Sequence, residues 1–275
     1  MQLNAFDLEV RGLVAKCWEA GKGTPLLLLH GSGPGAAAFG TWRFVLEPLA
    51  VHFNVFIMDM FGFGGSAKKP EGEPFDLELW MDQVRALVAH TGRDEVYVIG
   101  HSISGYLALR LAAEDARVKA LVTTGTMGEH FECNAETEKC WTFPETREAL
   151  KSTLTGLMFD TSVITDELLD LRMDILHDGV YGPYFTRMFQ GNKQSYIDEA
   201  TLTGEEFEQI QCPTLLIHGR NDVMFPAEEL TLKIAEHLPH ADVLLLGACA
   251  HLPATEHPER VVREVMAFFK KHNLS

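Results

Sequence analysis

A serine that follows a short apolar segment is the residue whose setting most suggests nucleophilic chemistry. Residues 96–99 are apolar and mostly β-branched, which predicts a buried strand, and Gly100-His101-Ser102 follows directly. Residues 106–113 are rich in alanine and leucine, which predicts a helix after the turn. A turn of this kind exposes the serine Oγ, and the Ile103 amide at the helix start could stabilise a negatively charged oxygen. We therefore predict that Ser102 is a nucleophile.

The turn departs from the usual G-x-S-x-G pattern in one position. Ser104 stands where the second glycine is expected, and Gly105 follows one residue later. Serine is small, so we expect the turn to tolerate it. On its own the pattern leaves open a chance turn between a strand and a helix.

A serine hydroxyl needs a base to remove its proton, and an imidazole oriented by a carboxylate is a common one. Asp222 follows a predicted strand at 213–218, and His251 lies in the loop after another at 242–246. Serine, aspartate and histidine in this chain order, each at a strand end, is the order found in α/β-hydrolases. Asp59 is a competing carboxylate, but it ends a strand that precedes the serine.

A glycine-rich segment follows the apolar run at residues 25–29. The segment His30-Gly31-Ser32-Gly33-Pro34-Gly35 predicts a loop whose backbone comes close to a ligand. We expect Gly31 and Gly33 to lie beside that ligand. We expect the Ser32 amide to be the second donor to an oxyanion. An ordinary glycine-rich turn is the alternative.

The elements that carry these residues alternate between strand and helix. This alternation predicts an α/β fold with a mostly parallel sheet and helices on both faces, and sites in such sheets lie at the carboxyl ends of strands. Between residues 128 and 208 no buried strand is visible, and amphipathic helical stretches occur at 145–158, 165–177, 182–190 and 193–201. We interpret 128–208 as an inserted helical cap on a core made of 1–127 and 209–275.

Composition excludes several classes of function. The chain has 275 residues and a formal net charge of −16, which argues against nucleic acid and anionic membranes as partners. No signal peptide or membrane span is expected from the sequence. Five scattered cysteines without a C-x-x-C pair predict reduced thiols in a cytoplasm. A zinc site at Cys249 and His251 is an alternative, but no second ligand pair accompanies it; we expect no metal and no cofactor.

Several segments together resemble the meta-cleavage product hydrolases, a family of α/β-hydrolases. The resemblance lies in the glycine-rich loop from His30 to Ala36, in Trp42-Arg43, in the loop from Asp59 to Gly64, and in the cap segment from Phe159 to Arg172. It covers nearly the whole chain. It implies an α/β-hydrolase fold and cleavage of C–C bonds in 2-hydroxy-6-oxohexa-2,4-dienoates from aromatic degradation.

The resemblance also implies roles for single residues. Ser102, Asp222 and His251 would form the triad, and the amides of Ser32 and Ile103 the oxyanion hole. Arg172 would hold the substrate carboxylate, which suits the planar donor fork of a guanidinium; a surface arginine of the cap is the alternative.

Two pocket positions depart from the family. His101 replaces the usual asparagine before the nucleophile, and Leu252 replaces the usual tryptophan after the histidine. His101 could still donate a hydrogen bond to a substrate oxygen, or take no part.

These departures keep two other functions open. The first is a carboxylesterase or lactonase that uses the same triad. The second is a ligand-binding or signalling protein on the hydrolase fold. The family further implies a small-molecule substrate and allows a homodimer or larger homo-oligomer.

Overall fold

An eight-stranded sheet forms the centre of the protein. The computed structural model describes residues 2–274. The strands lie in the order β1-β2-β4-β3-β5-β6-β7-β8; β2 is antiparallel to both β1 and β4, and all pairs from β4 to β8 are parallel. Their bounds are β1 Leu3–Val10, β2 Leu13–Gly21, β3 Pro25–Leu29, β4 Asn54–Met58, β5 Val96–His101, β6 Val118–Thr124, β7 Thr214–Gly219 and β8 Asp242–Leu246. The predicted α/β fold is confirmed.

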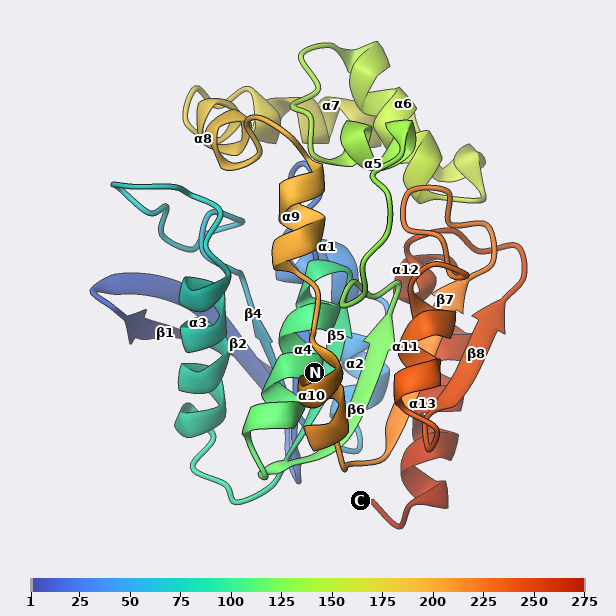
Figure 1. Cartoon of the computed structure of the whole chain (residues 1–275). Helices are drawn as coiled ribbons and strands as arrows, with labels where there is room; N and C mark the ends of the chain where they lie inside the picture. Colours follow the sequence, from blue (N-terminus) through green and yellow to red (C-terminus); the bar gives the residue numbers. More distant parts are fainter. Residues whose placement is uncertain (1, 275) are drawn as a thin grey trace.

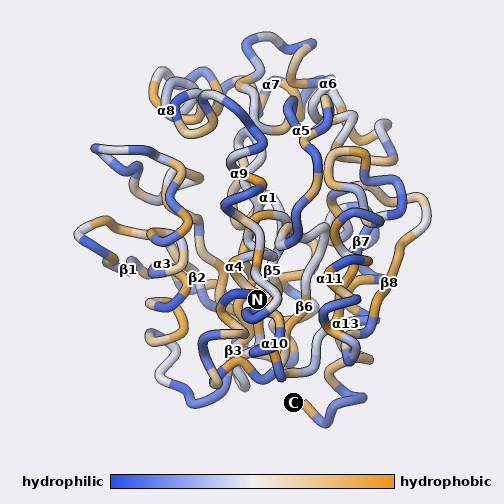
Figure 2. The backbone as a smooth tube through the Cα atoms, in the orientation of Figure 1, coloured by the Kyte–Doolittle hydropathy of each residue, from blue (hydrophilic) through white to orange (hydrophobic). Residues whose placement is uncertain are grey.

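The central strands are apolar throughout because both of their faces are buried. In β3, Leu27 and Leu29 pack into the core on one face, whereas Leu26 and Leu28 pack into the core on the other. Figure 2 shows hydrophobic residues gathered along the central strands, with hydrophilic residues in many loops and alternating with hydrophobic ones along the helices.

Helices cover both faces of this sheet. One face carries α3 Leu77–His90, α4 Ile103–Glu114 and α11 Thr231–His237, and the other carries α1 Ala38–Trp42, α2 Leu46–Ala50 and α13 Pro258–Lys271. The short α12 Pro253–Glu256 follows the loop that contains His251. Among the described residues, no helix has the length and apolar character needed to cross a membrane.

The segment between β6 and β7 is helical, as predicted. It contains α5 Ala135–Cys140, α6 Arg147–Leu157, a 3-10 turn Thr161–Val163, α7 Asp166–Leu176, α8 Tyr181–Met188, α9 Gln194–Glu199 and α10 Gly204–Gln209. Helices α5 to α8 lie across one end of the sheet, and α9 leads back from them to α10 (Figure 1). The sequence pattern indicated α6 to α9 but missed the short helices α5 and α10.

The two connections between this helical segment and the core lie side by side. Gly128 forms a parallel bridge with Thr201, and the Leu202 amide donates to the Gly128 carbonyl at 2.9 Å. Beyond this point α10 packs against α4 of the core. We propose that the cap ends near Leu202, a few residues before the predicted boundary at 208.

The close approach of α4 to the chain after β6 gives a test of this packing. A Cβ at Gly105 would lie 2.0 Å from Thr126 Oγ1 and 2.7 Å from Thr126 Cβ, and Thr126 is fully buried. We expect Gly105→Ala to lower the free energy of unfolding by about 2 kcal/mol or more, because a well-packed core resists added volume. Urea unfolding followed by circular dichroism measures this loss.

Gly204→Ala is the matched control, because nothing lies within 4 Å of its added Cβ. We expect that variant to keep or slightly raise stability, since alanine restricts the unfolded chain. Equal stabilities for the two variants would show that the Gly105 contact is not as tight as described.

Candidate active site

Ser102 occupies a strained turn between β5 and α4. Its backbone has φ 58° and ψ −124°, a conformation that a residue other than glycine rarely adopts. Hydrogen bonds hold the turn on both sides: the Ser102 amide donates to the Thr124 carbonyl, and the Ser102 carbonyl accepts from the amides of Gly105 and Met127. The strain is therefore stabilised by the strand and helix on either side.

The neighbours of the turn explain its small residues. A Cβ at Gly100 would lie 2.2 Å from the Ser104 carbonyl oxygen, and one at Gly31 would lie 2.9 Å from Ser102 Cβ. The Ser104 hydroxyl donates to the His30 carbonyl at 2.5 Å and so connects the turn to the glycine-rich loop. Ser104 thus adds a contact that glycine could not make.

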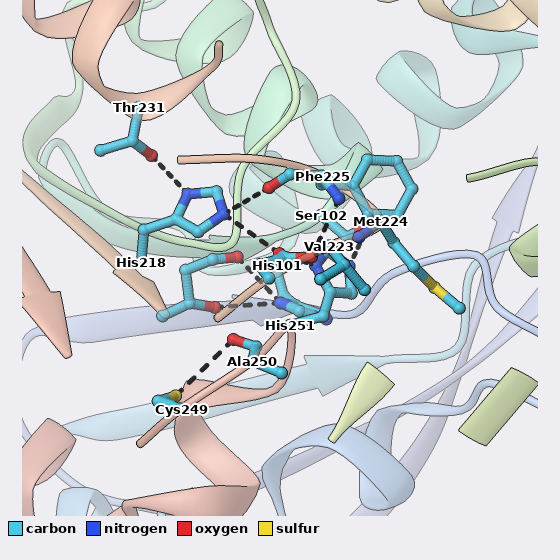
Figure 3. Close-up of polar contacts among 12 residues, drawn as sticks. His101, Ser102, His218, Val223, Met224, Phe225, Thr231, Cys249, Ala250 and His251 are labelled. Carbon is cyan, nitrogen blue, oxygen red and sulfur yellow. Dashed lines mark hydrogen bonds and ion pairs between the residues drawn. The ribbon is translucent and has the colours of Figure 1, made fainter. Parts of the chain in front are cut away.

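The three predicted catalytic side chains lie in one hydrogen-bonded chain. His251 Nε2 is 3.0 Å from Ser102 Oγ, and His251 Nδ1 is 2.6 Å from Asp222 Oδ2. All three residues are buried, and Figure 3 shows Ser102 beside His251. Since the carboxylate can only accept, we assign the proton of the neutral ring to Nδ1, which leaves Nε2 to accept the serine proton. This geometry can activate Ser102 or a water as a nucleophile.

Asp222 is charged although it is buried. Burial by itself would raise its pKa, but the imidazoles of His251 and His218 hold the pKa well below its usual range. Oδ1 accepts from the backbone amides of Met224 and Phe225, and Oδ2 lies 3.1 Å from His218 Nε2. His218 was not among the predicted site residues; its position near the end of the strand that precedes Asp222, four residues before that aspartate, was the available signal.

The predicted oxyanion donors lie on either side of Ser102. The Ile103 amide is at the first position of α4, and Ser32 follows Gly31, where an added Cβ would lie 2.9 Å from Ser102 Cβ. Neither amide has a hydrogen-bond acceptor among the described residues. The Ser32 hydroxyl accepts a 3.1 Å hydrogen bond from Nε1 of Trp141, a residue of the cap. The role of the two amides remains a prediction that this placement supports.

A cavity of about 70 Å³ lies over the nucleophile, between the core and the cap. Among its lining residues are the predicted site residues Gly31, Ser32, Gly33, His101, Ser102, Arg172, His251 and Leu252, together with apolar residues that include Cys140, Leu154 and Leu157. Ile103 is the predicted site residue near the cavity that is absent from its walls, which fits a contribution through its backbone. Asp222 lies behind His251.

Arg172 enters this cavity from α7 of the cap. Its Nη1 donates to the carbonyl oxygens of Pro34 and Gly35, at 3.0 and 2.7 Å. Burial lowers its pKa from the ordinary value, yet an arginine stays charged in a protein. No carboxylate of the described residues forms an ion pair with it. Arg172 is therefore a partly buried cation without an acidic partner among the described residues.

The cap also holds the loop of His251. The His251 amide donates to the carbonyl of Leu157, the last residue of α6. The Glu256 carboxylate accepts from the amides of Ala250 and Phe159, at 2.8 and 2.6 Å. The position of the histidine thus depends on the cap as well as on the sheet.

The competing sites have other roles. Asp59 accepts hydrogen bonds from the amides of Ala38 and Gly65, so it organises loops and does not contact His251. In the described part of the chain, no group of three or more histidine, cysteine or acidic residues is placed to hold a metal ion.

Comparison with known proteins places this geometry in a family. A family model described as "alpha/beta hydrolase fold" matches residues 24–258. A 2-hydroxy-6-oxononadienedioate/2-hydroxy-6-oxononatrienedioate hydrolase of Burkholderia vietnamiensis is 30% identical over 258 residues, covering 90% of this chain and 87% of the relative. A 2-hydroxy-6-oxo-2,4-heptadienoate hydrolase of Pseudomonas putida is 28% identical, covering 94% and 93%.

A solved structure supports the same family assignment. A serine-to-alanine mutant of the meta-cleavage product hydrolase from Pseudomonas fluorescens superposes with a TM-score of 0.91 at 28% identity, over 97% of this chain and 98% of that one. The chain belongs to the meta-cleavage product hydrolases. It is a hydrolase of the α/β-hydrolase fold, as the resemblance implied.

The ring nitrogens of His101 are arranged differently from what the sequence suggested. Its Nδ1 lies 2.8 Å from the Thr124 carbonyl, which can only accept, so the proton is on Nδ1. Nε2 then carries a lone pair and has no partner among the described residues. Where the sequence suggested a donor to substrate, the geometry gives an acceptor. Burial, with a smaller contribution from nearby His251, lowers the pKa of His101 to about 3.

This low pKa predicts a pH dependence of stability. An unfolded histidine titrates near pH 6.5, so between that pH and about 3 the unfolded chain binds a proton that folded His101 does not. Stability is therefore lost as pH falls below about 6.5. We expect the free energy of unfolding of the natural chain, relative to His101→Asn, to fall by about 1–2 kcal/mol between pH 7 and pH 5. Urea unfolding of both proteins at each pH measures it; a constant difference contradicts the burial of a neutral ring.

Proposed function

We propose that this hydrolase cleaves the C5–C6 bond of 2-hydroxy-6-oxohexa-2,4-dienoates that carry a small group at C6. The observation that carries the proposal is the Arg172 guanidinium, which contacts two carbonyl oxygens but no carboxylate of the described residues and lines the same cavity as Ser102. Partial burial leaves this cation less well solvated than at the surface, and a substrate carboxylate would supply the missing anionic partner. The substrate is therefore an anion whose scissile carbonyl lies at Ser102 when its carboxylate lies at Arg172.

The proposed reaction begins with a change of tautomer. The 2-hydroxyl proton leaves oxygen and a proton is added at C5, with His251 in the proton transfer, which gives a C2 ketone and a saturated C5. Ser102 Oγ, or a water deprotonated by the triad, then adds to the C6 carbonyl. The amides of Ser32 and Ile103 stabilise the resulting oxyanion.

Cleavage follows when the oxyanion collapses. The C5–C6 electron pair moves into the conjugated ketone, and protonation releases a 2-hydroxydienoate. C6 leaves as a carboxylic acid, directly if water attacked or after hydrolysis of a Ser102 ester. The negative charge that develops on the dienolate lies next to the carboxylate held by Arg172, so Arg172 acts in binding and in the transition state.

Neither alternative function is favoured by the relatives, which are named as hydrolases of dienoates. An ester or lactone substrate also leaves the charge of Arg172 unused. A cytoplasmic location and a homodimer or larger homo-oligomer remain proposals taken from the sequence.

The triad and the arginine are tested with a yellow 2-hydroxy-6-oxodienoate whose absorbance disappears on cleavage. We expect Ser102→Ala to lower kcat by about a thousandfold or more. Arg172→Ala should lower kcat/KM on the dienoate by roughly 100-fold, since it removes a partly buried, charged partner of the substrate carboxylate. The same variant should keep its activity on p-nitrophenyl acetate, which has no carboxylate.

Arg147→Ala is the matched control, because Arg147 is a half-exposed arginine of the cap that pairs with Asp166 and Asp170. It should match the natural chain on both substrates. If Arg172→Ala behaves like Arg147→Ala on the dienoate, Arg172 does not bind the carboxylate. If only the ester is cleaved, the protein is an esterase.

The volume of the cavity predicts the group at C6. About 70 Å³ is small next to the roughly 300–1,000 Å³ of typical ligand pockets. We expect kcat/KM for the 6-methyl dienoate to exceed that for the 6-phenyl dienoate by roughly 100-fold. Leu154→Ala should narrow this ratio because Leu154 lines the cavity, whereas Leu150→Ala, a buried residue of the same helix outside the lining, should not. Faster cleavage of the phenyl substrate by the natural chain would contradict the assignment.

A further inference from the structure

A second buried histidine contacts the carboxylate of the triad. His218 lies near the end of β7 and is fully buried. Its Nε2 is 3.1 Å from Asp222 Oδ2 and 2.8 Å from the Phe225 carbonyl oxygen, and its Nδ1 is 2.6 Å from Thr231 Oγ1. Figure 3 shows its ring between Thr231 of α11 and Phe225. No step of the proposed reaction uses this residue.

The contacts determine where its proton lies. Nε2 faces a carbonyl oxygen and an ionised carboxylate, which both only accept, so Nε2 carries a proton. The Thr231 hydroxyl can donate to an unprotonated Nδ1, so a neutral ring leaves no buried group at this contact unpaired. Thr231 therefore stabilises the tautomer in which His218 donates to Asp222.

We propose that His218 is a positioning residue of the triad, a neutral imidazole whose Nε2–H donates to the same Asp222 oxygen that His251 uses. Two backbone amides hold Oδ1 and two imidazoles share Oδ2, so the carboxylate cannot rotate away from His251. The shared hydrogen bond also withdraws negative charge from Oδ2. A less negative Oδ2 stabilises the imidazolium form of His251 less. His251 therefore returns its proton to the substrate more readily.

A pH profile of kcat/KM can detect this effect on His251, because the other titratable groups near the triad do not change their charge. Burial raises the pKa of the Cys140 thiol to about 12 and that of Cys249 above its ordinary range, while His101 stays neutral above about pH 3. Burial also favours the neutral form of His30, which lies beyond His101. The titratable groups that face the catalytic imidazole and carboxylate from β5, β7, α5 and the loop after β8 are thus His101, His218, Cys140 and Cys249.

The inference rests on the proposed triad, and its test is a comparison of His218→Leu with His218→Gln. Leucine removes the donor, whereas the glutamine amide can place an N–H close to the position of Nε2. We expect the acidic limb of kcat/KM to move to higher pH by roughly half a unit to one unit in His218→Leu. We also expect kcat to fall roughly tenfold in that variant. His218→Gln should restore the limb and most of kcat.

His237→Leu is the matched control, since His237 is a half-exposed histidine that pairs with Glu129, and it should leave the profile unchanged. An unmoved acidic limb in His218→Leu, or equal limbs in His218→Leu and His218→Gln, would overturn the proposal even if both variants are less stable. Profiles are measured with the dienoate and with p-nitrophenyl acetate. Failure of the natural chain on the dienoate alone would count against the proposed substrate and leave this test valid on the ester.

A second measurement needs no variant at this position. In the natural chain labelled with ¹⁵N-histidine, nuclear magnetic resonance separates protonated from unprotonated ring nitrogens. We expect His218 to have a protonated Nε2 and an unprotonated Nδ1 at pH 7, with the signals assigned by their absence in His218→Gln. An unprotonated Nε2 could not donate to Asp222 and would overturn the proposal.

Discussion

The structure depends on keeping one carboxylate charged inside the protein. Asp222 is fully screened from solvent, and an ion in that position is stable only if hydrogen-bond donors replace water. Four N–H groups of the described residues do so: two amides of its own loop, His251 of the proposed triad and the neighbouring His218. Because one of these donors, His251, lies in the loop after β8, the ends of the neighbouring strands β7 and β8 must lie close together.

The cap completes a site that the sheet only begins. It provides the cation in the cavity through Arg172, the donor to the Ser32 hydroxyl through Trp141, and the acceptor for the His251 amide at Leu157. Each of these contacts crosses between cap and core, and each reaches a different part of the reaction centre. A displacement of the cap would therefore change substrate binding and the alignment of the triad together.

The sequence predicted the features that leave a repeating pattern of apolar residues or a characteristic chain order of functional residues. Buried strands appear as apolar runs, and the chain order of Ser102, Asp222 and His251 indicated the triad. Features defined by a single contact could not be predicted. Helix α5 has six residues, too few to show a helical repeat, although it carries Cys140 to the cavity wall. His218 lies in an apolar run, which predicts only a strand residue. The assignment of His101 Nε2 as an acceptor follows only from the contact of Nδ1 with the Thr124 carbonyl.

The charge of the protein and the charge of its proposed substrate have the same sign, and the structure resolves this conflict by distance. The formal net charge of −16 acts on an approaching anion through solvent, where salt at physiological strength screens interactions beyond about 8 Å. Inside the cavity the proposed anion would meet Arg172, which pairs with no acid of the described residues and is partly buried, so that water screens its charge less than at the surface. Asp222, the acid of the proposed triad, already accepts hydrogen bonds from its four donors and lies behind His251. The proposed role of Arg172 thus places discrimination for a carboxylate after entry into the cavity rather than during approach.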